Sequence, residues 1–594
     1  MCGITGFTWE DKDLLRRMTD IIAYRGPDDH GYYTDKDISL GHRRLSIIDL
    51  SAAGHQPMSD KEGEITIVFN GEIYNFRELR KELEGKYDFA SSTDTEVLIY
   101  GYKEWGPEGL LKRINGMFAF ALWDSVKKLL FLARDRLGKK PLYYYLQEDK
   151  IVFASEIKAL LEFPKIKREL DVAAVNSYLS YRFIPSDKTM IKRVKKLLPA
   201  HYAVFSCGKL AIKRYWDIDW TVSDKPEDYY VKKFDSLFRS CVEKRLFSDV
   251  PLGAFLSGGI DSSAVVAMNS KLRPDPVKTF TVGFNHETDE TRYAKLVAEH
   301  LGCDHHELIL DYHDMTKALP NIIWYMDEPS TDITMVPLYF LSKFAKQKVT
   351  VVNSGEGADE LFSGYAHYKI GSPIFNFVPS AVKNRIYYWY YSPFKRSDIQ
   401  QFFRKAPEED ALLMQHLRSK EPKHLLNKLL NFDIKHELPN WQLARVDRMT
   451  MANAQEARVP FLDYEMVEFA ASLPVNMKVK NITNKYLLKQ AVKKWLPKEV
   501  IDRRKQGFTT PMHDWFREDL LGLAESVLSK DNIAKRKYIN YAYVQKLMES
   551  ERRIKRTLPF RYTSFKLLTL LMLEMWQKMY LDNDSKALKL DAFY

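Results

Sequence analysis

Two adjacent glycines after a short apolar run constrain the fold of this chain more than any other feature. Val250 to Leu256 reads as a buried strand, and Ser257-Gly258-Gly259-Ile260-Asp261-Ser262-Ser263 follows it. A helix is predicted to continue from Ala264 to Met268. Glycines let the backbone approach a ligand closely, and the first turn of a helix presents free N–H groups. The segment therefore predicts an anion site between a strand and a helix of an α/β domain.

Two later runs extend this pattern. Lys278 to Phe284 reads as a second strand, and Val349 to Val352 as a third, which leads into Asn353-Ser354-Gly355-Glu356-Gly357-Ala358-Asp359-Glu360. Three acids within five residues also suit a plain capped helix start. Beside an anion site, however, carboxylates repel the ligand unless metal ions intervene. The pattern favours Asp359 as a metal ligand and leaves Glu356 free to face a second substrate.

The amino terminus carries a candidate nucleophile. The chain begins Met1-Cys2-Gly3-Ile4, although it contains only four cysteines. Removal of Met1 is expected because the next residue is small, and it would leave Cys2 with a thiol and a free α-amine. An α-amine is partly neutral at physiological pH and can act as the base for the thiol. A chance cysteine that is later buried is the alternative.

Two segments of the first half offer polar groups suited to a binding site. Ile65 to Phe69 reads as a strand that ends in Asn70-Gly71, where a side-chain and a backbone N–H could form an oxyanion hole. Asn-Gly alone usually marks a hairpin turn. Ser91 to Glu96 offers the carboxylate of Asp94, which otherwise reads as a helix N-cap.

Together these segments resemble the class II glutamine amidotransferase domain, an α+β N-terminal-nucleophile fold built as an αββα sandwich. The resemblance rests on MCGI, YRGPD, HRRLSIID, FNGEIYN, the Asp94 segment and RDRLGKKPLYY. It implies that Cys2 attacks the amide carbon of glutamine, forms a γ-glutamyl thioester and releases ammonia. It also implies the pocket: Asn70 and Gly71 form the oxyanion hole, Arg44 pairs with the α-carboxylate, Glu72 and Asp94 hold the α-amine, and Leu45, Ile47 and Ile48 complete the glutamine site.

The second half resembles the ATP pyrophosphatases, whose signature matches SGGIDSS. The resemblance implies an α/β parallel-sheet domain with added helices, which cleaves ATP to AMP and pyrophosphate. Asp261 and Asp359 would ligate Mg²⁺, a hard cation suited to carboxylate and phosphate oxygens. The implied ATP-binding residues are Leu256, Ser257, Gly258, Gly259, Asp261, Ser262, Val282, Ser354 and Gly355.

SGGIDSS, GEGADELF and LARVDRMTMANAQEARVPFLD, behind an amino-terminal MCGI, resemble the glutamine-hydrolysing asparagine synthetase family over most of the chain. The family implies that ammonia from Cys2 moves through an enclosed tunnel to a second site. There the side-chain carboxylate of aspartate attacks ATP, becomes β-aspartyl-AMP and is amidated to asparagine. By the same resemblance Glu356 supports adenylation and takes a proton from ammonia, Lys505 stabilises charge on the phosphates, and a homodimer is the family expectation.

A chain of 594 residues is too long for one core, so at least two domains are expected. The pattern changes around 215–230, where a polar linker precedes a long amphipathic helix. We therefore predict an amidotransferase domain at 2–215 and a synthetase domain at 228–594. Residues 366–440 have no obvious counterpart in compact bacterial members of the family. They are expected to be a helical elaboration of the surface or of a dimer contact, and altered access to the acceptor site is the alternative.

Composition restricts partners and compartment. The net charge is +11, with basic residues scattered among acids, which indicates small anionic substrates rather than nucleic acid. Four separated cysteines favour a reducing cytoplasm over a disulfide framework or zinc site. No signal peptide or membrane span is visible; the best candidate, Leu567 to Leu573, reads as a buried helix. The expected partners are therefore glutamine, aspartate and ATP, with no nucleic acid and no membrane.

Three alternatives stand beside an asparagine-forming ligase. The same chemistry could amidate another carboxylate, in a cell-wall precursor, polysaccharide or secondary metabolite, because no residue in the sequence separates aspartate from those acceptors. A β-lactam-synthetase-like cyclase predicts a lost N-terminal nucleophile, whereas Cys2 is present. A non-catalytic assembly or storage protein predicts decay of SGGIDSS or GEGADE, and both are intact.

Overall fold

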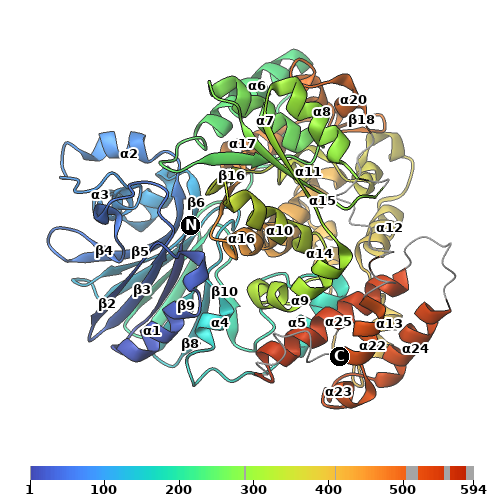
Figure 1. Cartoon of the computed structure of the whole chain (residues 1–594), viewed down its shortest axis with the longest axis horizontal. Coiled ribbons are helices and arrows are strands. Elements are labelled where there is room, and N and C mark those ends of the chain that lie inside the picture. The colour runs from blue at the N-terminus through green and yellow to red at the C-terminus, as the bar shows by residue number, and fades with distance from the viewer. Residues whose placement is uncertain are drawn as a thin grey trace.

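The computed structural model describes residues 2–286, 289–408, 410–503, 515, 520–553 and 562–583. A β-rich amino-terminal part lies on the left in Figure 1, and a larger α/β part lies beside it. The helices nearest the carboxyl terminus, drawn in red, pack below that α/β part.

Two six-stranded antiparallel sheets form the amino-terminal part. The first has the order β10-β8-β9-β1-β3-β2, and the second β12-β11-β7-β6-β5-β4. The strands of the first sheet are β1 (Gly3–Phe7), β2 (Asp29–Asp35), β3 (Ile38–Arg44), β8 (Tyr143–Gln147), β9 (Lys150–Ala154) and β10 (Val194–Lys196). Those of the second are β4 (Met58–Ser59), β5 (Ile65–Ile73), β6 (Gly116–Asp124), β7 (Leu129–Arg134), β11 (His201–Ser206) and β12 (Lys209–Arg214).

Apolar residues of both sheets fill the space between them. Ile4, Leu40, Val68, Ala121 and Phe153 are all fully buried in this layer. Strand side chains alternate between the two faces of a sheet, so the opposite faces need cover as well. Helices α1 (Lys12–Asp20) and α4 (Ile157–Leu160) cover the first sheet, and α2 (Phe76–Leu83) and α3 (Glu96–Arg113) cover the second. The αββα sandwich predicted from the sequence is confirmed.

A five-stranded parallel sheet, in the order β15-β14-β13-β16-β17, organises the second part. Helices lie on both of its faces, as the near-continuous apolar strands require. The strands are β13 (Leu252–Phe255), β14 (Lys278–Gly283), β15 (Asp304–Ile309), β16 (Val351–Asn353) and β17 (Glu456–Arg458). The covering helices are α6 (Glu227–Glu243), α7 (Ile260–Leu272), α8 (Thr291–Leu301), α9 (Tyr312–Met326), α10 (Met335–Lys346), α16 (Leu443–Met451), α17 (Tyr464–Ser472) and α19 (Tyr486–Val492). The predicted parallel-sheet α/β fold is confirmed.

Residues 366–440 are mostly helical and have a small core of their own. Tyr387 and Tyr391 of the aromatic run are buried there, whereas Trp389 and Tyr390 of the same helix are 63% and 59% exposed. The predicted helical structure of this segment is confirmed, whereas a dimer contact and an effect on acceptor access stay predictions. The elements are α12 (Ser380–Tyr391), α13 (Arg396–Phe402), α14 (Leu412–Arg418), α15 (Leu425–Phe432) and the π-helical segment Asp433–Gln442.

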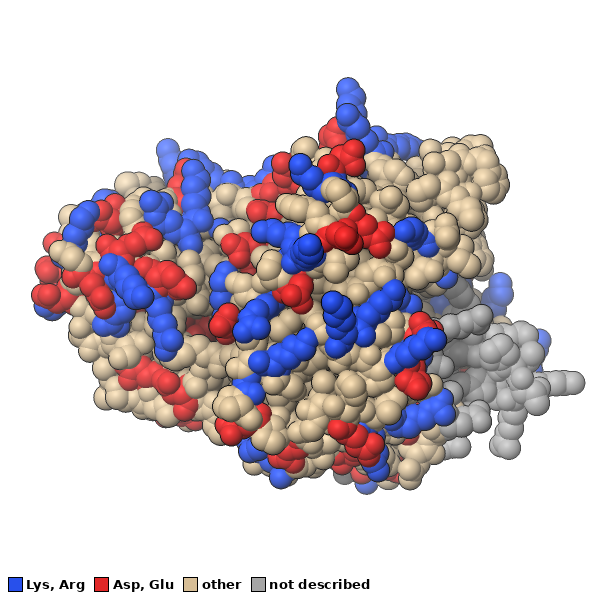
Figure 2. Space-filling view, turned by 90° about the horizontal axis from the view of Figure 1, so that it is seen from above, with Lys and Arg blue, Asp and Glu red and all other residues tan. Residues whose placement is uncertain are grey.

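The carboxyl-terminal helices complete the fold. Leu567 to Leu573 lies within α25 (Tyr562–Tyr580), and both of those leucines are buried, as predicted. Among the described residues, no helix combines the length and apolarity that a membrane crossing requires. On the face seen in Figure 2, basic and acidic side chains are interspersed. Further helices are α5 (Val172–Tyr181), α11 (Ala358–Phe362), α18 (Val475–Lys478), α20 (Lys498–Asp502), α22 (Leu521–Val527), α23 (Lys530–Ala534) and α24 (Tyr541–Arg552).

Candidate active sites

Cys2 stands immediately before β1 and is 7% exposed. Its backbone N–H donates to Asn70 Oδ1 at 3.2 Å, and its carbonyl accepts from Arg25 Nε at 3.0 Å. Burial raises the pKa of the Cys2 thiol, while the Leu45 backbone N–H and the Arg44 guanidinium oppose that rise. The sheet therefore brings Cys2 against the two segments, at 44–45 and 70, that the sequence predicted around it.

The Asn70 side chain carries an unsatisfied hydrogen-bond donor within the described chain. Asn70 is fully buried on β5, and its Nδ2 group has no hydrogen-bond partner in the part of the chain that the structure describes. A buried unpartnered N–H is costly unless a ligand completes it. Glycine is required at the next position, because a Cβ on Gly71 would lie 2.1 Å from the Met117 carbonyl oxygen. Both features fit an oxyanion hole beside Cys2.

The Arg44 guanidinium is held by main-chain oxygens. Nη1 donates to the Ser51 carbonyl at 3.1 Å, and Nη2 donates to the Asp49 carbonyl at 2.5 Å. A Cβ on Gly54 would lie 1.8 Å from Nη2, so only glycine leaves room for this arginine. The other three predicted pocket residues of this stretch are buried in the adjoining apolar cluster: Leu45, Ile47 and Ile48.

Glu72 and Asp94 form a buried acidic pair. Asp94 accepts the Ile73 N–H at 2.7 Å, and burial raises its pKa to about 7. Burial and the Asp94 carboxylate raise the pKa of Glu72 well above its ordinary value. A cationic ligand group would relieve this repulsion, which is what the predicted contact with the α-amine of glutamine requires.

The loop after β13 is built as the sequence predicts. Gly258 has a φ of +72°, and a Cβ there would lie 2.5 Å from the Ala294 backbone nitrogen. Ser257 Oγ and Ser262 Oγ are 3.1 Å apart and lie across the turn from each other. The loop after β16 packs against it, since a Cβ on Gly355 would lie 2.6 Å from Ser262 N. Parallel strands bring both loops to one edge of the sheet.

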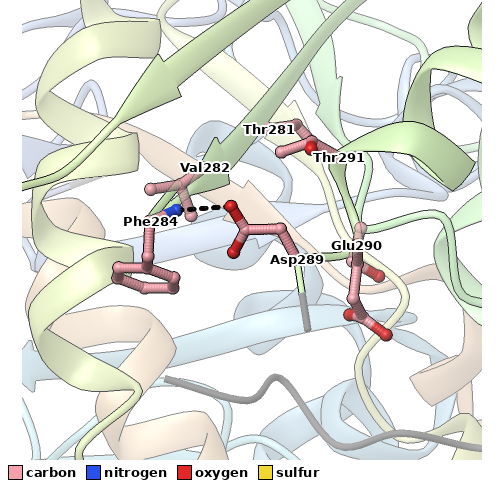
Figure 3. Close-up of a pocket in the computed structure, with 7 residues that line it drawn as sticks. Thr281, Val282, Phe284, Asp289, Glu290 and Thr291 are labelled. Atoms are coloured by element: carbon pink, nitrogen blue, oxygen red, sulfur yellow. Dashed lines mark hydrogen bonds between the residues drawn. The ribbon is translucent and has the colours of Figure 1, made fainter. Parts of the chain in front are cut away.

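A pocket opens beside this edge, at the end of β14 (Figure 3). Val282, the predicted adenine contact, lines it, and so does Ser257. Asp289 accepts the Phe284 N–H at 2.8 Å and closes the turn after the strand. Arg503 Nη2 donates to Glu290 at the rim at 2.6 Å. Lys505, predicted to act on the phosphates, lies outside the described residues.

Lys485 lies between the two predicted metal ligands. Its Nζ is 2.5 Å from the Asp261 carboxylate and 2.5 Å from the Asp359 carboxylate. Burial alone would lower the pKa of Lys485, but the two carboxylates raise it above its ordinary value. Lys485 also has a φ of +53°, a conformation that side-chain-bearing residues adopt at a cost. No sequence pattern points to this residue, because it lies far along the chain at an ordinary basic helix start.

Glu356 is held by a second cation that the sequence analysis did not assign. Arg445 Nη2 donates to Glu356 Oε1 at 2.8 Å, and its Nη1 donates to Asp332 Oδ2 at 2.6 Å. Arg445 belongs to the LARVDRMT motif. A basic residue in a motif that follows GEGADE could therefore have been proposed as a partner for Glu356. The carboxylates raise the pKa of Arg445 although it is buried. Lys485 and Arg445 thus pair with three acids of this site, Asp261, Asp359 and Glu356, whereas burial raises the pKa of Glu360 to about 8.

Comparison with known proteins agrees with this geometry. The asparagine synthase family matches residues 233–578, and the glutamine amidotransferase domain matches residues 1–216. The chain is 34% identical to asparagine synthetase [glutamine-hydrolyzing] 1 of Bacillus subtilis, over 92% of this chain and 93% of that protein. It is 32% identical to a putative asparagine synthetase of Mycobacterium tuberculosis, over 87% of this chain and 88% of that protein. It is also 27% identical to amidase chyE of Penicillium rubens, over 92% and 94% of the two chains.

The chain belongs to the glutamine-hydrolysing asparagine synthetase family. It is an amidating ligase that takes nitrogen from glutamine, and its family implies nucleotide binding. The family, enzyme class and two-domain architecture predicted from the sequence are thereby confirmed.

In this synthetase, helix α16 links the two sites. Arg445 at its start bonds Glu356, whereas Asp447 two residues on accepts Arg25 Nη2 at 2.9 Å. Arg25 in turn holds the Cys2 carbonyl, so one helix contacts the surroundings of both predicted catalytic residues. A pocket beside α16 is lined by both domains, including Lys139, Tyr143, Lys196, Glu328, Leu443, Asp447 and Arg448. Arg25 belongs to the YRGPD motif, but no sequence pattern pairs it with Asp447.

Proposed function

We propose that this chain makes asparagine from aspartate, with glutamine as nitrogen donor and ATP cleaved to AMP and pyrophosphate through β-aspartyl-AMP. The observation that carries the proposal is the unpartnered buried Nδ2 of Asn70 beside Cys2, because it is a ready oxyanion donor in a chain whose nucleotide loop is also intact. The aspartate acceptor is supported by the relatives named asparagine synthetases that match along nearly the whole chain.

At the first site, Cys2 with a free α-amine attacks the amide carbon of glutamine. The amide C–N bond breaks, ammonia leaves, and water later hydrolyses the thioester to glutamate. Asn70 Nδ2 and the Gly71 N–H bind the developing oxyanion, a role that typically contributes about 10²–10³ in rate. Arg44 binds the α-carboxylate, and Glu72 with Asp94 binds the α-ammonium group.

At the second site, the β-carboxylate of aspartate attacks the α-phosphorus of ATP and pyrophosphate leaves. Ammonia, moving along α16 between the domains, attacks the acyl carbon; AMP leaves, and Glu356 takes the extra proton. Ser257, Gly258, Gly259 and Ser262 hold phosphate oxygens with N–H and O–H donors. Lys485 adds positive charge beside them, and Arg445 holds Glu356 in place.

Mg²⁺ fits this site through Asp261 and Asp359. Their carboxylates already share one cation, Lys485 Nζ, which is the behaviour of a cation-binding pair. No group of three His, Cys, Asp or Glu side chains able to hold a metal occurs among the described residues, so phosphate oxygens and water would complete the ligand set. When bound, Mg²⁺ supplies charge neutralisation for the triphosphate.

An acceptor screen tests the proposal. The full chain receives glutamine, Mg-ATP and one candidate acid at a time, and pyrophosphate release and product mass are followed. Aspartate should give one pyrophosphate per asparagine. Silence with aspartate and turnover with a cell-wall peptide or another acid would replace the acceptor, and the similarity to a fungal protein named an amidase makes that second candidate concrete.

A further inference from the structure

Arg458 on β17 reaches from the synthetase domain into the predicted glutamine pocket. Its Nη2 lies 3.3 Å from Glu72 Oε2, and the arginine is fully buried. The rest of the guanidinium is fixed inside its own domain. Nε donates to Glu456 Oε1 at 2.6 Å, and Nη1 donates to the Phe247 carbonyl at 2.5 Å.

The main chain of the same residue contacts the nucleotide loop. β16 and β17 pair with Asn353 opposite Arg458, and the Arg458 carbonyl accepts the Ser354 N–H at 2.9 Å. Ser354 opens the loop that carries Glu356 and Asp359. The side chain of Arg458 therefore belongs to one site and its carbonyl to the other.

The charges that face Glu72 explain why this arginine matters. They are Asp94 from the loop before α3, Glu456 and Arg458 from β17, and the amino terminus, with Tyr74 beside them. Arg458 lowers the pKa of both Glu72 and Asp94 against the larger effect of burial. Its Nη2 forms no hydrogen bond within the described chain, so a donor is available to Glu72 when a ligand draws that carboxylate into line.

We propose that Arg458 is a positioning residue shared by the two sites: its guanidinium holds Glu72 for the α-ammonium group of glutamine, while its carbonyl fixes Ser354 at the nucleotide loop. The inference rests on the proposed function, because it takes Glu72 as a glutamine contact. Since binding free energies are reciprocal, a nucleotide that rearranges the loop changes glutamine affinity, and glutamine changes nucleotide affinity by the same factor.

Glutaminase assays on the full chain test whether the Arg458 guanidinium holds Glu72 for glutamine. Arg458→Met should raise the KM for glutamine about tenfold near neutral pH, with a smaller change in kcat, because Glu72 loses a charge-assisted contact. The lowest KM should also move to higher pH, because without the cation Glu72 and Asp94 ionise later. Arg458→Lys should restore part of both effects. Arg536→Met is the matched control, since that buried arginine pairs with Glu574 and Asp582 in the carboxyl-terminal part instead. Ammonia-dependent synthesis by each variant reports whether the synthetase domain is folded.

The coupling between the nucleotide loop and the glutamine pocket is tested by the KM for glutamine, measured with and without Mg²⁺ and a non-hydrolysable ATP analogue. The native chain should show a change of about fivefold or more, and Arg458→Met should abolish it. A native KM and pH profile in Arg458→Met and Arg458→Lys, or the same shift in Arg536→Met, would overturn the inference. So would an ATP-analogue effect that survives in Arg458→Met. If Glu72→Gln itself leaves the KM unchanged, the fault lies in the assignment of Glu72 and both proposals fall; if Glu72→Gln raises it and the Arg458 variants do not, only this inference falls.

Discussion

The two sites treat their acids in opposite ways. In the glutamine pocket, Glu72 and Asp94 are buried together, and Arg458 pairs with Glu72 at 3.3 Å. In the synthetase site, Asp261 and Asp359 both contact Lys485, and Glu356 contacts Arg445. Within the described chain Asp94 forms no ion pair, so the first arrangement can accept a cation from an amino-acid ligand. The second already contains its cations, which suits a ligand as negative as a triphosphate.

This contrast also separates what each site needs from its partner domain. The glutamine pocket takes Asp447 and Arg458 from the synthetase domain, through Arg25 and Glu72. The nucleotide loops are built within one sheet and its helices. Substitution of these synthetase-domain residues should therefore lower glutaminase activity, whereas substitutions in the amidotransferase domain should affect synthesis from ammonia less.

Removal of the Cys2 nucleophile should give the largest difference between the activities of the two sites. Cys2→Ala should lower glutamine-dependent synthesis at least about a thousandfold, since no other group replaces the attacking sulfur. Ammonia-dependent synthesis should keep its native rate, as product formation with ammonium salts in place of glutamine will show. Loss of both activities would mean that the sites are not separable.

Loss of the bridging cation should damage the other site. Lys485→Met should lower both glutamine- and ammonia-dependent synthesis by about 10²–10³, because two carboxylates then face the phosphates without it. Glutamine hydrolysis in the absence of ATP should remain, which a glutamate assay measures. Leu487→Met, on the same helix and buried in the apolar core, is the matched control. Native synthesis by Lys485→Met would contradict the electrostatic account of this site.

Arg445→Gln tests whether Arg445 acts on the synthesis step through Glu356. Without the guanidinium, Glu356 and Asp332 lose their shared partner, and ammonia-dependent synthesis should fall about tenfold to a hundredfold. The glutaminase KM should stay within about twofold of native. A fall confined to glutamine-dependent turnover would instead place Arg445 on the nitrogen route.

The pH dependence of the KM for glutamine should give the smallest difference between the two sites. The Asp94 pKa is raised to about 7 by burial, so this carboxylate is ionised above that pH and protonated below it. The KM for glutamine should therefore rise about tenfold between pH 8 and pH 6, because the α-ammonium group loses an ionic partner. Asp94→Asn should flatten the profile at a high KM. A native profile independent of pH would contradict the role given to Asp94.

Sequence reasoning identified the groups that lie in contiguous motifs. Gly71, Gly258 and Gly355 could be placed because glycine is required where two backbones or a ligand approach closely, and the structure shows those approaches. Single strands such as Ile65 to Phe69 and Val250 to Leu256 could be identified from apolar runs, whereas their assembly into sheets was implied by the family resemblance. Lys485, Arg445 and Arg25 could not be found in this way, because each acts on a carboxylate that lies far away in the chain. Their roles depend on tertiary contacts for which a single sequence carries no spacing rule.

The central claim is that nitrogen released at Cys2 reaches the activated acceptor inside this chain. Glutamine labelled with ¹⁵N in its amide, supplied with aspartate, Mg-ATP and an excess of unlabelled ammonium, tests it directly. The account predicts asparagine whose side-chain amide is mostly ¹⁵N despite the unlabelled pool. Asparagine carrying the isotope ratio of the bulk solution, or no asparagine at all, would contradict it.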